Sequence, residues 1–397
     1  MPEKPNEELF DAAEQPRRFM ARVLVIGAGL AGLACALEAT TAGHHVVVLE
    51  RSSRIGGRGT SQNIDGLPIG FGPHLFLKKG PFHNLARKLS GIKMKVSPIQ
   101  LHRTEIIGSG IVRPTDNTRL SLERKRLLRN GDSNDPITQG CRFLSSWDSQ
   151  HSGERFHALQ KKKLLVSNEG WSGMVGRLAA ALDEVGVFIE CGLEVTQIDG
   201  EKATLSDGRE IEVDVIVLAC GPAATRKLVR PLDAQQCDSV FSKLERTTAS
   251  FIEVGLDSKP LLGKQAVVDG EQRFAVLDYR AIQPRLGLEG SHLSAVAVGG
   301  LAGDSGPTLY TSANERLEAL QLFLNQRAAG WDKHIVHQSQ QEKITILDSG
   351  DFKIPQNAFA NHKVLLAGAW VESEYELSDA AVYSGRSAGR LISSVID

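Results

Sequence analysis

The stretch RVLVIGAGLAGL, residues 22–33, joins a short apolar run to three glycines and then becomes helical in character. An apolar run of this length that ends at a glycine is typical of a buried parallel strand. The following LAGLACALEATTAG, residues 30–43, predicts a helix of small side chains that is closed by Gly43. Strand, tight turn and helix together predict the first unit of a doubly wound α/β fold.

Each glycine of the turn has its own role in this interpretation. Gly27 permits the tight turn, Gly29 lets a pyrophosphate approach bare backbone, and Gly32 lets the helix pack closely on the sheet. The amide groups of Leu30 and Ala31 at the start of the helix then face an anion. From this stretch alone, a tight strand-to-helix turn without any ligand stays open as the alternative.

The second apolar run ends in a carboxylate. HHVVVLE, residues 44–50, predicts a second strand that finishes at Glu50, with seventeen residues between it and Gly32. A carboxylate in that place accepts hydrogen bonds from ribose hydroxyls. Glu50 therefore favours a dinucleotide with a free 2′-hydroxyl over one with a 2′-phosphate, and it favours a nucleotide site over an empty turn.

A second glycine pair follows in the loop RSSRIGGRGTSQ, residues 51–62. Adjacent glycines expose backbone amides, and the planar fork of arginine donors suits phosphate. A solvated basic loop is the alternative, which the position directly behind the nucleotide turn disfavours. The candidate residues of this loop are Arg51, Gly57 and Arg58, with Arg54 and Gly56 beside them.

Length and composition set the class of protein. A chain of 397 residues is about two to three domains long, and its content of 41% hydrophobic and 23% charged residues is ordinary for a soluble globular protein. The formal net charge of -1 gives no reason to expect nucleic acid as a partner. The five cysteines have no C-x-x-C spacing, so we expect neither a metal site nor a disulfide framework.

The apolar runs and the first residues predict a cytoplasmic protein. No stretch approaches the roughly eighteen consecutive apolar residues of a membrane span, and the charged start MPEKPNEELFDAAEQPRR is not typical of a secretory signal. Residues 1–20 are polar and precede the first strand. We therefore expect them to form an N-terminal extension.

The run from Val23 to Arg58 resembles a known family through GAGLAGL, Glu50 and the R-x-G-G-R loop. It is similar to the flavin-dependent oxidoreductases that include phytoene desaturases, carotenoid isomerases, squalene-pathway dehydrogenases, protoporphyrinogen oxidase and the amine oxidases. A nicotinamide dehydrogenase does not normally carry the second glycine pair. In the resembled family this pair wraps the pyrophosphate of FAD, so the resemblance implies FAD as the cofactor.

Two later segments carry the same resemblance. Residues 168–199 look like the return of the chain into the FAD domain, where the backbone near Val195 would hold the adenine end. Residues 362–394 predict a buried strand, a loop and a helix that begins near Ser378 or Asp379, with Ser378 as the N-cap. In the family this helix directs its positive end at the flavin pyrimidine ring. The cofactor-binding residues implied here are Gly368, Glu372, Asp379 and Ala380.

The predicted fold class is α/β, as a two-domain flavoprotein. We expect residues 21–69, 166–224 and 346–397 to build a discontinuous, Rossmann-like FAD-binding domain. Residues 70–165 and 225–345 are expected to build a substrate domain around a mixed α+β sheet, because several of their segments alternate or run apolar like strands.

Three positions depart from the family pattern. Relatives often place an acid after the glycine of the C-terminal strand, where this chain has Ala369, with Glu372 close enough to substitute. In the motif GFGPHLF, Gly70 stands where relatives commonly carry an acid. The amine-oxidase branch has an aromatic residue at the position of Leu377, and Tyr375 is displaced from it by two. An aromatic cage for a cation is therefore disfavoured, and an apolar substrate is favoured.

His74 in the same motif is the candidate catalytic residue, since in relatives this loop lies close to the isoalloxazine ring. A histidine satisfied by backbone hydrogen bonds is the alternative. A flavin accepts a hydride at N5, and the protein has mainly to hold the donor carbon against that atom in a dry pocket.

Three functions stay open. The first is an FAD-dependent desaturase, dehydrogenase or isomerase that acts on an isoprenoid, carotenoid-like or similar apolar molecule. The second is an FAD oxidase of amines or of a porphyrinogen. The third is a flavin-fold protein without turnover that serves as a binding or assembly partner, which Ala369 and Gly70 motivate. The arginine- and lysine-rich stretch 113–163 is expected to be a solvated surface, and a basic lip that rests peripherally on a membrane is the alternative.

Overall fold

The computed structural model covers the chain as follows. The described residues are 20–64, 67–70, 72–89, 91, 93–108, 134–147, 153–167, 169–283, 289–348 and 353–396. The expected N-terminal extension, residues 1–20, lies outside the described residues apart from Met20. Much of the basic stretch 113–163 also lies outside them, including the run LERKRLLRN.

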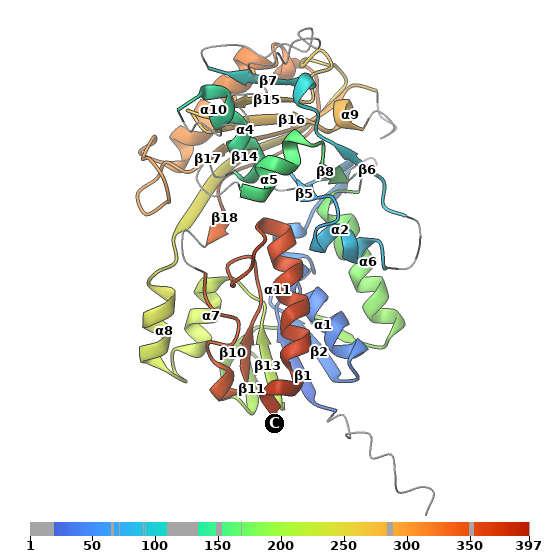
Figure 1. Cartoon of the computed structure of the whole chain (residues 1–397), viewed down its shortest axis with the longest axis vertical. Coiled ribbons are helices and arrows are strands. Elements are labelled where there is room, and N and C mark those ends of the chain that lie inside the picture. The colour runs from blue at the N-terminus through green and yellow to red at the C-terminus, as the bar shows by residue number, and fades with distance from the viewer. Residues whose placement is uncertain are drawn as a thin grey trace, which may run out of the picture.

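A five-stranded parallel sheet forms the lower half of the molecule in Figure 1. Its order is β19 (Val364–Leu366), β13 (Val215–Leu218), β1 (Arg22–Ile26), β2 (His45–Glu50) and β9 (Phe188–Cys191). Every neighbouring pair of these strands is parallel. The strands come from segments far apart in the sequence, so the sheet forms only when these segments meet.

Alternate residues of the central strand face two different cores. Val23 and Val25 pack into a core on one face of the sheet, whereas Leu24 and Ile26 pack into a core on the other. A strand buried on both faces has this uninterrupted apolar sequence. The first core includes α1 (Leu30–Thr41), α6 (Gly170–Glu184) and α11 (Leu377–Leu391). The second includes α7 (Pro222–Val229), α8 (Ala234–Phe241) and the antiparallel strands β10 (Val195–Ile198), β11 (Lys202–Leu205) and β12 (Glu210–Glu212).

Helices α1 and α11 pack side by side through small residues. A Cβ atom on Gly385 would lie 2.1 Å from the carbonyl oxygen of Ala31, and one on Gly389 would lie 2.9 Å from that of Cys35. Glycine at both positions therefore allows the two backbones to approach. α11 runs along α1 and up to the junction beneath α5, so this packing places the start of α11 between the two halves of the molecule (Figure 1).

A six-stranded mixed sheet forms the upper half. All its neighbouring strands are antiparallel except β15 and β7, which are parallel. Its order is β18 (Ile335–Asp348), β14 (Arg246–Leu256), β17 (Ser291–Val298), β16 (Phe274–Asp278), β15 (Ala266–Asp269) and β7 (Thr104–Ile107). A parallel sheet and a mixed sheet in one chain confirm the predicted fold class.

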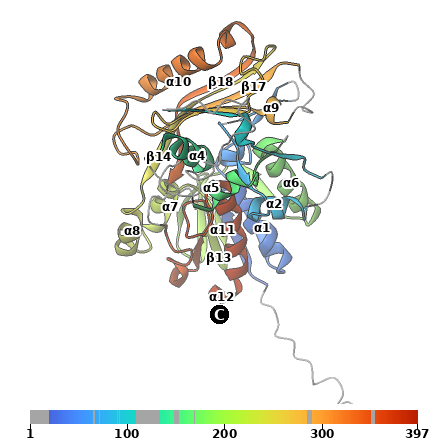
Figure 2. The same cartoon turned by 45° about the horizontal axis from the view of Figure 1, so that its top comes forward.

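Helices cover both faces of the mixed sheet. α10 (Ala313–Arg327) packs on one face against Ile252 and Val254 of β14. α4 (Pro136–Ser146) and α5 (Gly153–Gln160) pack on the other face. Figure 2 shows α4 and α5 between this sheet and α11. The inner face of the mixed sheet therefore looks toward the parallel sheet.

Shorter elements connect the two halves. The strands β5 (Phe76–Leu77), β8 (Leu164–Ser167) and β6 (Val96–Pro98) form a small antiparallel sheet, and β3 (Gln62–Ile64) pairs with β4 (Leu67–Ile69). The other elements are α2 (Pro81–Ala86), α9 (Tyr279–Ile282), α12 (Ser393–Ile396) and 3-10 turns at Gly57–Gly59, Leu101–Arg103, Trp331–Lys333 and Ala360–His362.

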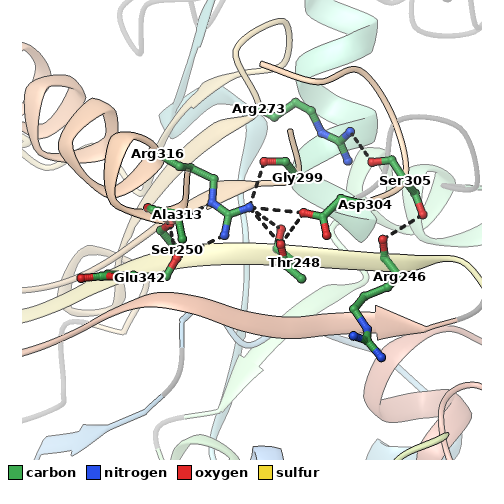
Figure 3. A network of polar contacts seen from close by, with 10 residues as sticks. All are labelled: Arg246, Thr248, Ser250, Arg273, Gly299, Asp304, Ser305, Ala313, Arg316 and Glu342. Carbon is green, nitrogen blue, oxygen red and sulfur yellow. Dashed lines mark hydrogen bonds and ion pairs between the residues drawn. The ribbon is translucent and has the colours of Figure 1, made fainter. Parts of the chain in front are cut away.

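A buried arginine fastens α10 to the mixed sheet. The guanidinium of Arg316 is fully buried and faces the carboxylate of Asp304 at 3.5 Å. It also donates to the hydroxyl of Ser250 at 2.9 Å and to the carbonyl oxygen of Gly299 at 2.9 Å (Figure 3). The hydroxyl of Thr248 bridges the same two charged groups. Since a buried charge must be paired, these bonds fix the helix, the strand and the loop after β17 together.

We expect Arg316→Met to lower the free energy of unfolding by roughly 3 to 5 kcal/mol, because Asp304 would then be buried without its partner. Chemical denaturation measures this. Arg226→Met is the matched control, since its ion pair with Asp238 is 47% and 44% exposed, and its loss should change the free energy of unfolding far less. Equal losses of unfolding free energy in the two variants would show that the buried network around Arg316 stabilises the protein no more than an exposed ion pair does.

Candidate active site

The three glycines of the first turn differ in the space around them. A Cβ atom on Gly27, whose φ is +110°, would lie 2.9 Å from the backbone of Ala219. One on Gly32 would lie 1.9 Å from the carbonyl oxygen of Gly27. At Gly29 the nearest atom to such a Cβ would be the carbonyl oxygen of Gly56, at 3.9 Å. Packing thus accounts for the first and third glycines, whereas at the second a Cβ would make only an ordinary van der Waals contact.

The start of α1 is suited to an anion. Its N-cap, Gly29, has no side chain to accept a hydrogen bond, and its first turn has no acidic residue. The amides of Leu30, Ala31 and Gly32 have no acceptor within the helix, as for every helix start. The positive end of the helix dipole therefore meets uncapped donors at the edge of the parallel sheet.

Glu50 lies at the end of β2, beside this turn. One carboxylate oxygen accepts from the amide of Ala28 at 2.8 Å, and the other accepts from the amide of Ser52 at 2.8 Å. Each oxygen keeps a second lone pair for another donor. The structure thus places the carboxylate where the sequence predicts it, and it adds a contact that holds the glycine turn.

The second glycine loop folds onto the first. The amide of Gly56 donates to the carbonyl oxygen of Ala28 at 2.7 Å, and Gly56 has a φ of +110°. A Cβ on Gly57 would lie 3.6 Å from the Cα of Gly29. The two loops therefore form one backbone surface, as the sequence predicts for a pyrophosphate site.

The two candidate arginines of this loop, Arg51 and Arg58, contact different parts of the protein. Arg58 is exposed, and its guanidinium donates to the carbonyl oxygen of Ile346 on β18 at 3.1 Å. Arg58 therefore links the glycine loop to the mixed sheet. Arg51 is 71% exposed and lies 4.0 Å from the carboxylate of Glu194.

Val195 and Gly368 lie at two further strand ends around the turn. Val195 is buried in the same core as Ile26. Gly368 follows β19, and its amide donates to the hydroxyl of Ser384 on α11 at 2.9 Å. Gly368 therefore lies at the edge of the parallel sheet where the glycine loops lie, whereas Val195 begins β10 of the antiparallel sheet.

The segment after Gly368 contains Ala369, one of the three departures from the family pattern. Ala369 is buried, and a Cβ on Gly368 would collide with the indole nitrogen of Trp370 at 2.4 Å. Glu372 is exposed, and its amide donates to the carbonyl oxygen of Ile354 at 2.9 Å. Nothing in these contacts assigns Glu372 the role of the absent acid.

Helix α11 begins at Leu377 with Glu376 as its N-cap, so the N-cap prediction for Ser378 is wrong by two residues. The first turn is buried at Asp379 and Ala380. The amide of Ala380 donates to the carbonyl oxygen of Glu376 at 3.2 Å. No side chain caps this helix start, so its remaining amides are available to a ligand.

Asp379 itself is engaged by the protein. Its carboxylate accepts from the amides of Leu77 at 2.9 Å and Phe82 at 3.2 Å. It also faces the buried guanidinium of Arg155 at 3.4 Å. Burial raises the pKa of Asp379 to about 6, against the opposing charge of Arg155. The sequence analysis missed Arg155, because an arginine in a short helix is ordinarily solvated.

His74 is buried in the junction between the two sheets. Its amide donates to the hydroxyl of Tyr279 at 2.8 Å, and its ring lies 5.2 Å from that of Trp171. The ring atom Nε2 has no hydrogen-bond partner among the described residues. Burial lowers the pKa of His74 to about 4, although the nearby carboxylate of Glu253 opposes the shift. The ring is therefore neutral near pH 7.

The position of His74 accounts for Gly70. A Cβ on Gly70 would lie 2.6 Å from Nε2 of His74, so no larger side chain fits beside the ring as it stands. The amide of Gly70 donates to the buried carboxylate of Glu253 at 3.0 Å. A side chain at position 70 would thus have to displace the ring of His74, and the carboxylate of Glu253 from the mixed sheet binds the backbone there.

Comparison with known proteins agrees with this geometry. Residues 25–90 match the family model of the NAD(P)-binding Rossmann-like domain. A putative flavin-containing monoamine oxidase of Mycobacterium tuberculosis is 48% identical over 50 residues, which are 13% of this chain and 11% of the relative. A zeta-carotene desaturase of Synechocystis is 41% identical over 75 residues, 19% of this chain and 15% of the relative. The matched segments thus span a small part of these curated relatives.

Two solved structures match over almost the whole chain. An oxidoreductase from Methanosarcina mazei has a TM-score of 0.68 at 18% identity, over 92% of this chain and 99% of the other. A putative protoporphyrinogen oxidase from Exiguobacterium has a TM-score of 0.64 at 15% identity, over 94% and 98%. The chain has the fold of these oxidoreductases. The resemblance to flavin-dependent amine oxidases and carotene desaturases is confirmed for the Rossmann segment by sequence.

None of the helices in the described part of the chain has the length and apolar content needed to cross a bilayer. Within the same residues, no three His, Cys, Asp or Glu side chains are grouped so that they could hold a metal ion.

We expect the protein to lose stability in mild acid through His74. Between pH 4 and pH 6.5 the folded protein binds fewer protons at His74 than the unfolded chain does, so its free energy of unfolding falls as the pH drops through this window. From pH 7 to pH 5 the loss is about 2 kcal/mol. His74→Gln should remove it, as chemical denaturation at the two pH values can measure.

Asp379 has the opposite effect on the pH dependence of stability. Its raised pKa means that its contribution is present at low pH and is lost as the pH rises through 3.8 to about 6. This effect is common to the wild type and the variant and cancels in their difference. If the free energy of unfolding of His74→Gln falls between pH 7 and pH 5 as much as that of the wild type, His74 is not the cause of the loss.

Proposed function

We propose that the chain is an FAD-dependent oxidoreductase that binds FAD along the two glycine loops. The pyrophosphate would lie on the uncapped start of α1 and on the amide of Gly57. Arg58 would neutralise its charge from the other side, as a planar donor suited to phosphate. The lack of any close contact at Gly29 supports this placement, since Gly29 is the one glycine of the turn that packing does not explain.

The remaining contacts follow from the strand ends. Glu50 has free lone pairs for the ribose hydroxyls, and the backbone at Val195 lies beyond it for the adenine end. The uncapped start of α11, in the turn that leads to Ala380, together with Gly368, would face the flavin end. Asp379 would serve this end indirectly, because its carboxylate positions the segment that follows His74.

An apolar substrate is the second part of the proposal. The observation that carries it is a set of half-buried hydrophobic side chains on the inner-face core of the mixed sheet: Ile344, Ile346, Tyr375 and Leu377. Arg58 binds the backbone of Ile346, so the strand that carries Ile344 and Ile346 lies beside the glycine loop. Apolar surface that stays partly exposed beside a cofactor cradle is typical of a ligand site.

The substrate class that fits this surface is an isoprenoid, carotenoid-like or similar apolar molecule. FAD supplies hydride acceptance at its N5 atom when bound. The protein would hold the donor carbon and exclude water through the apolar walls. The neutral His74, whose Nε2 has no partner, would accept a proton or a hydrogen bond.

An amine oxidase is the second candidate. The observation that favours it is the pair formed by Tyr375 and Tyr383, whose ring centroids lie 5.3 Å apart near the start of α11. Aromatic faces of this kind attract an amine cation. Leu377 at the expected cage position disfavours it.

Peripheral contact with a membrane is the proposal for the basic stretch. Lys161, Lys162 and Lys163 support it, since all three are exposed at the end of α5. Exposed lysines attract anionic lipid surfaces. An apolar substrate would then be taken from the bilayer.

An absorbance spectrum of the purified protein, followed by anaerobic reduction and re-exposure to air, tests the proposed function. We expect a flavin spectrum that bleaches with dithionite and returns. Slow return in air and turnover of an apolar polyene would support the desaturase class, whereas rapid return with peroxide and turnover of an amine would support the oxidase class. Absence of flavin after incubation with FAD would refute the proposal, and a bound flavin that cannot be reduced would favour a binding role.

Gly29→Asp should abolish FAD binding while leaving the fold intact. Gly29 has a φ of -79°, and the nearest atom to a Cβ there would lie 3.9 Å away, so an aspartate fits without strain, but its charge repels a pyrophosphate. Gly153→Asp is the control, because Gly153 is exposed at the start of α5 and a Cβ there meets nothing within 4 Å. Flavin content and melting temperature measure the outcome. Full retention of FAD by Gly29→Asp would place the cradle elsewhere.

A further inference from the structure

The loop between β4 and β5 is held by side chains of the mixed sheet. The carboxylate of Glu253 on β14 accepts from the amide of Gly70 at 3.0 Å and from that of Gly72 at 3.3 Å. The hydroxyl of Tyr279 accepts from the amide of His74 at 2.8 Å. The described residues of this loop belong to no strand or helix, so these bonds set its position.

Glu253 is a buried charge with a partner. The ring atom Nε2 of His292 on β17 lies 2.9 Å from its carboxylate, and both side chains are almost fully buried. Burial by itself raises the pKa of Glu253, but the hydrogen bond and charge of His292, with the amide of Gly70, lower it below the ordinary value. A carboxylate is costly to bury, and these bonds offset the cost.

The loop between β4 and β5, held by Glu253 and Tyr279, adjoins the glycine loop proposed to bind FAD. The rings of His74 and Trp171 lie 5.2 Å apart. A Cβ on Gly59, in the second glycine loop, would lie 3.6 Å from the Cβ of Trp171. One side chain therefore separates His74 from the cradle, and the carboxylate of Glu253 lies close enough to His74 to affect its pKa.

We propose that Glu253, paired with His292, is a positioning residue of the active site, which fixes the loop that carries His74 and places a negative charge near it. The part of this inference that concerns the charge rests on the proposed function, since the charge acts on a flavin only if FAD occupies the cradle. A nearby negative charge disfavours the addition of electrons to a bound flavin, most strongly where water is excluded.

Two variants separate the effect of the negative charge of Glu253 from the effect of its side-chain length. Glu253→Gln removes the charge and keeps the length of the side chain. Glu253→Asp keeps the charge but is shorter by one methylene and does not reach both amides. Glu105→Gln is the matched control, because Glu105 on β7 is also buried in the mixed sheet and paired, with Lys264, at its far edge.

Hydrogen exchange of the protein without FAD measures the clamp. We expect peptides that cover Gly70, Gly72 and His74 to exchange roughly tenfold or more faster in both Glu253 variants, because each loses hydrogen bonds to a charged group. Glu105→Gln should leave these peptides at the wild-type rate. Unchanged exchange in both Glu253 variants, or an equal change in Glu105→Gln, would overturn the proposed positioning role.

A redox titration of the FAD-loaded proteins measures the charge. The midpoint potential of the flavin should rise in Glu253→Gln and stay at the wild-type value in Glu253→Asp and Glu105→Gln. A potential that is unchanged in Glu253→Gln would overturn the electrostatic part. If the wild type binds no FAD, the proposed function fails, and the exchange experiment still decides whether Glu253 clamps the loop.

Discussion

Direct contact between backbones at the end of β1 is the constraint on which the rest of the structure depends. Gly32 lies against the carbonyl oxygen of Gly27, and the amide of Gly56 donates to the carbonyl oxygen of Ala28 at 2.7 Å. These contacts bring α1 onto the parallel sheet and bring the two glycine loops together. Side chains larger than hydrogen would separate the same backbones and remove the surface that faces the anion.

The junction between the two sheets depends on buried charge instead. The backbone from Gly70 onward is bound by Glu253 from the mixed sheet and by Asp379 from the start of α11. Arg155 completes the second of these contacts by donating to the carbonyl oxygen of Leu75 at 2.9 Å. Hydrogen bonds to charged groups are stronger and more directional than apolar contacts. The loop next to the proposed FAD site is thereby held in one place without a strand ladder.

The sequence allowed prediction of the parts of the site that depend on local backbone geometry. The glycine turn, the carboxylate of Glu50 and the second glycine loop lie together as expected, because each follows a strand end that the apolar runs identify. The start of α11 was misplaced by two residues, since Glu376 and not Ser378 forms the N-cap. Helix ends depend on neighbouring loops, which a local pattern does not describe.

What could not be predicted is the polar network around His74. Glu253 lies in SFIEVGLD as one acidic residue within an apolar run, and this isolated charge in a buried strand was the available signal. Its partners, Gly70 and His292, are 183 and 39 residues away in the chain. No periodicity links such positions, so only the register between β14 and β17 and the path of the loop bring them together.

The sequence by itself determined the doubly wound unit, the nucleotide turn and the class of cofactor it suits, because these rest on strand periodicity and on glycine spacing within about thirty residues. The tertiary structure alone decided which charges are buried and which apolar side chains stay open between the two sheets. Burial is a property of packed segments that are distant along the chain. The substrate class therefore has to be inferred from Ile344, Ile346, Tyr375 and Leu377 in the folded junction rather than from any motif.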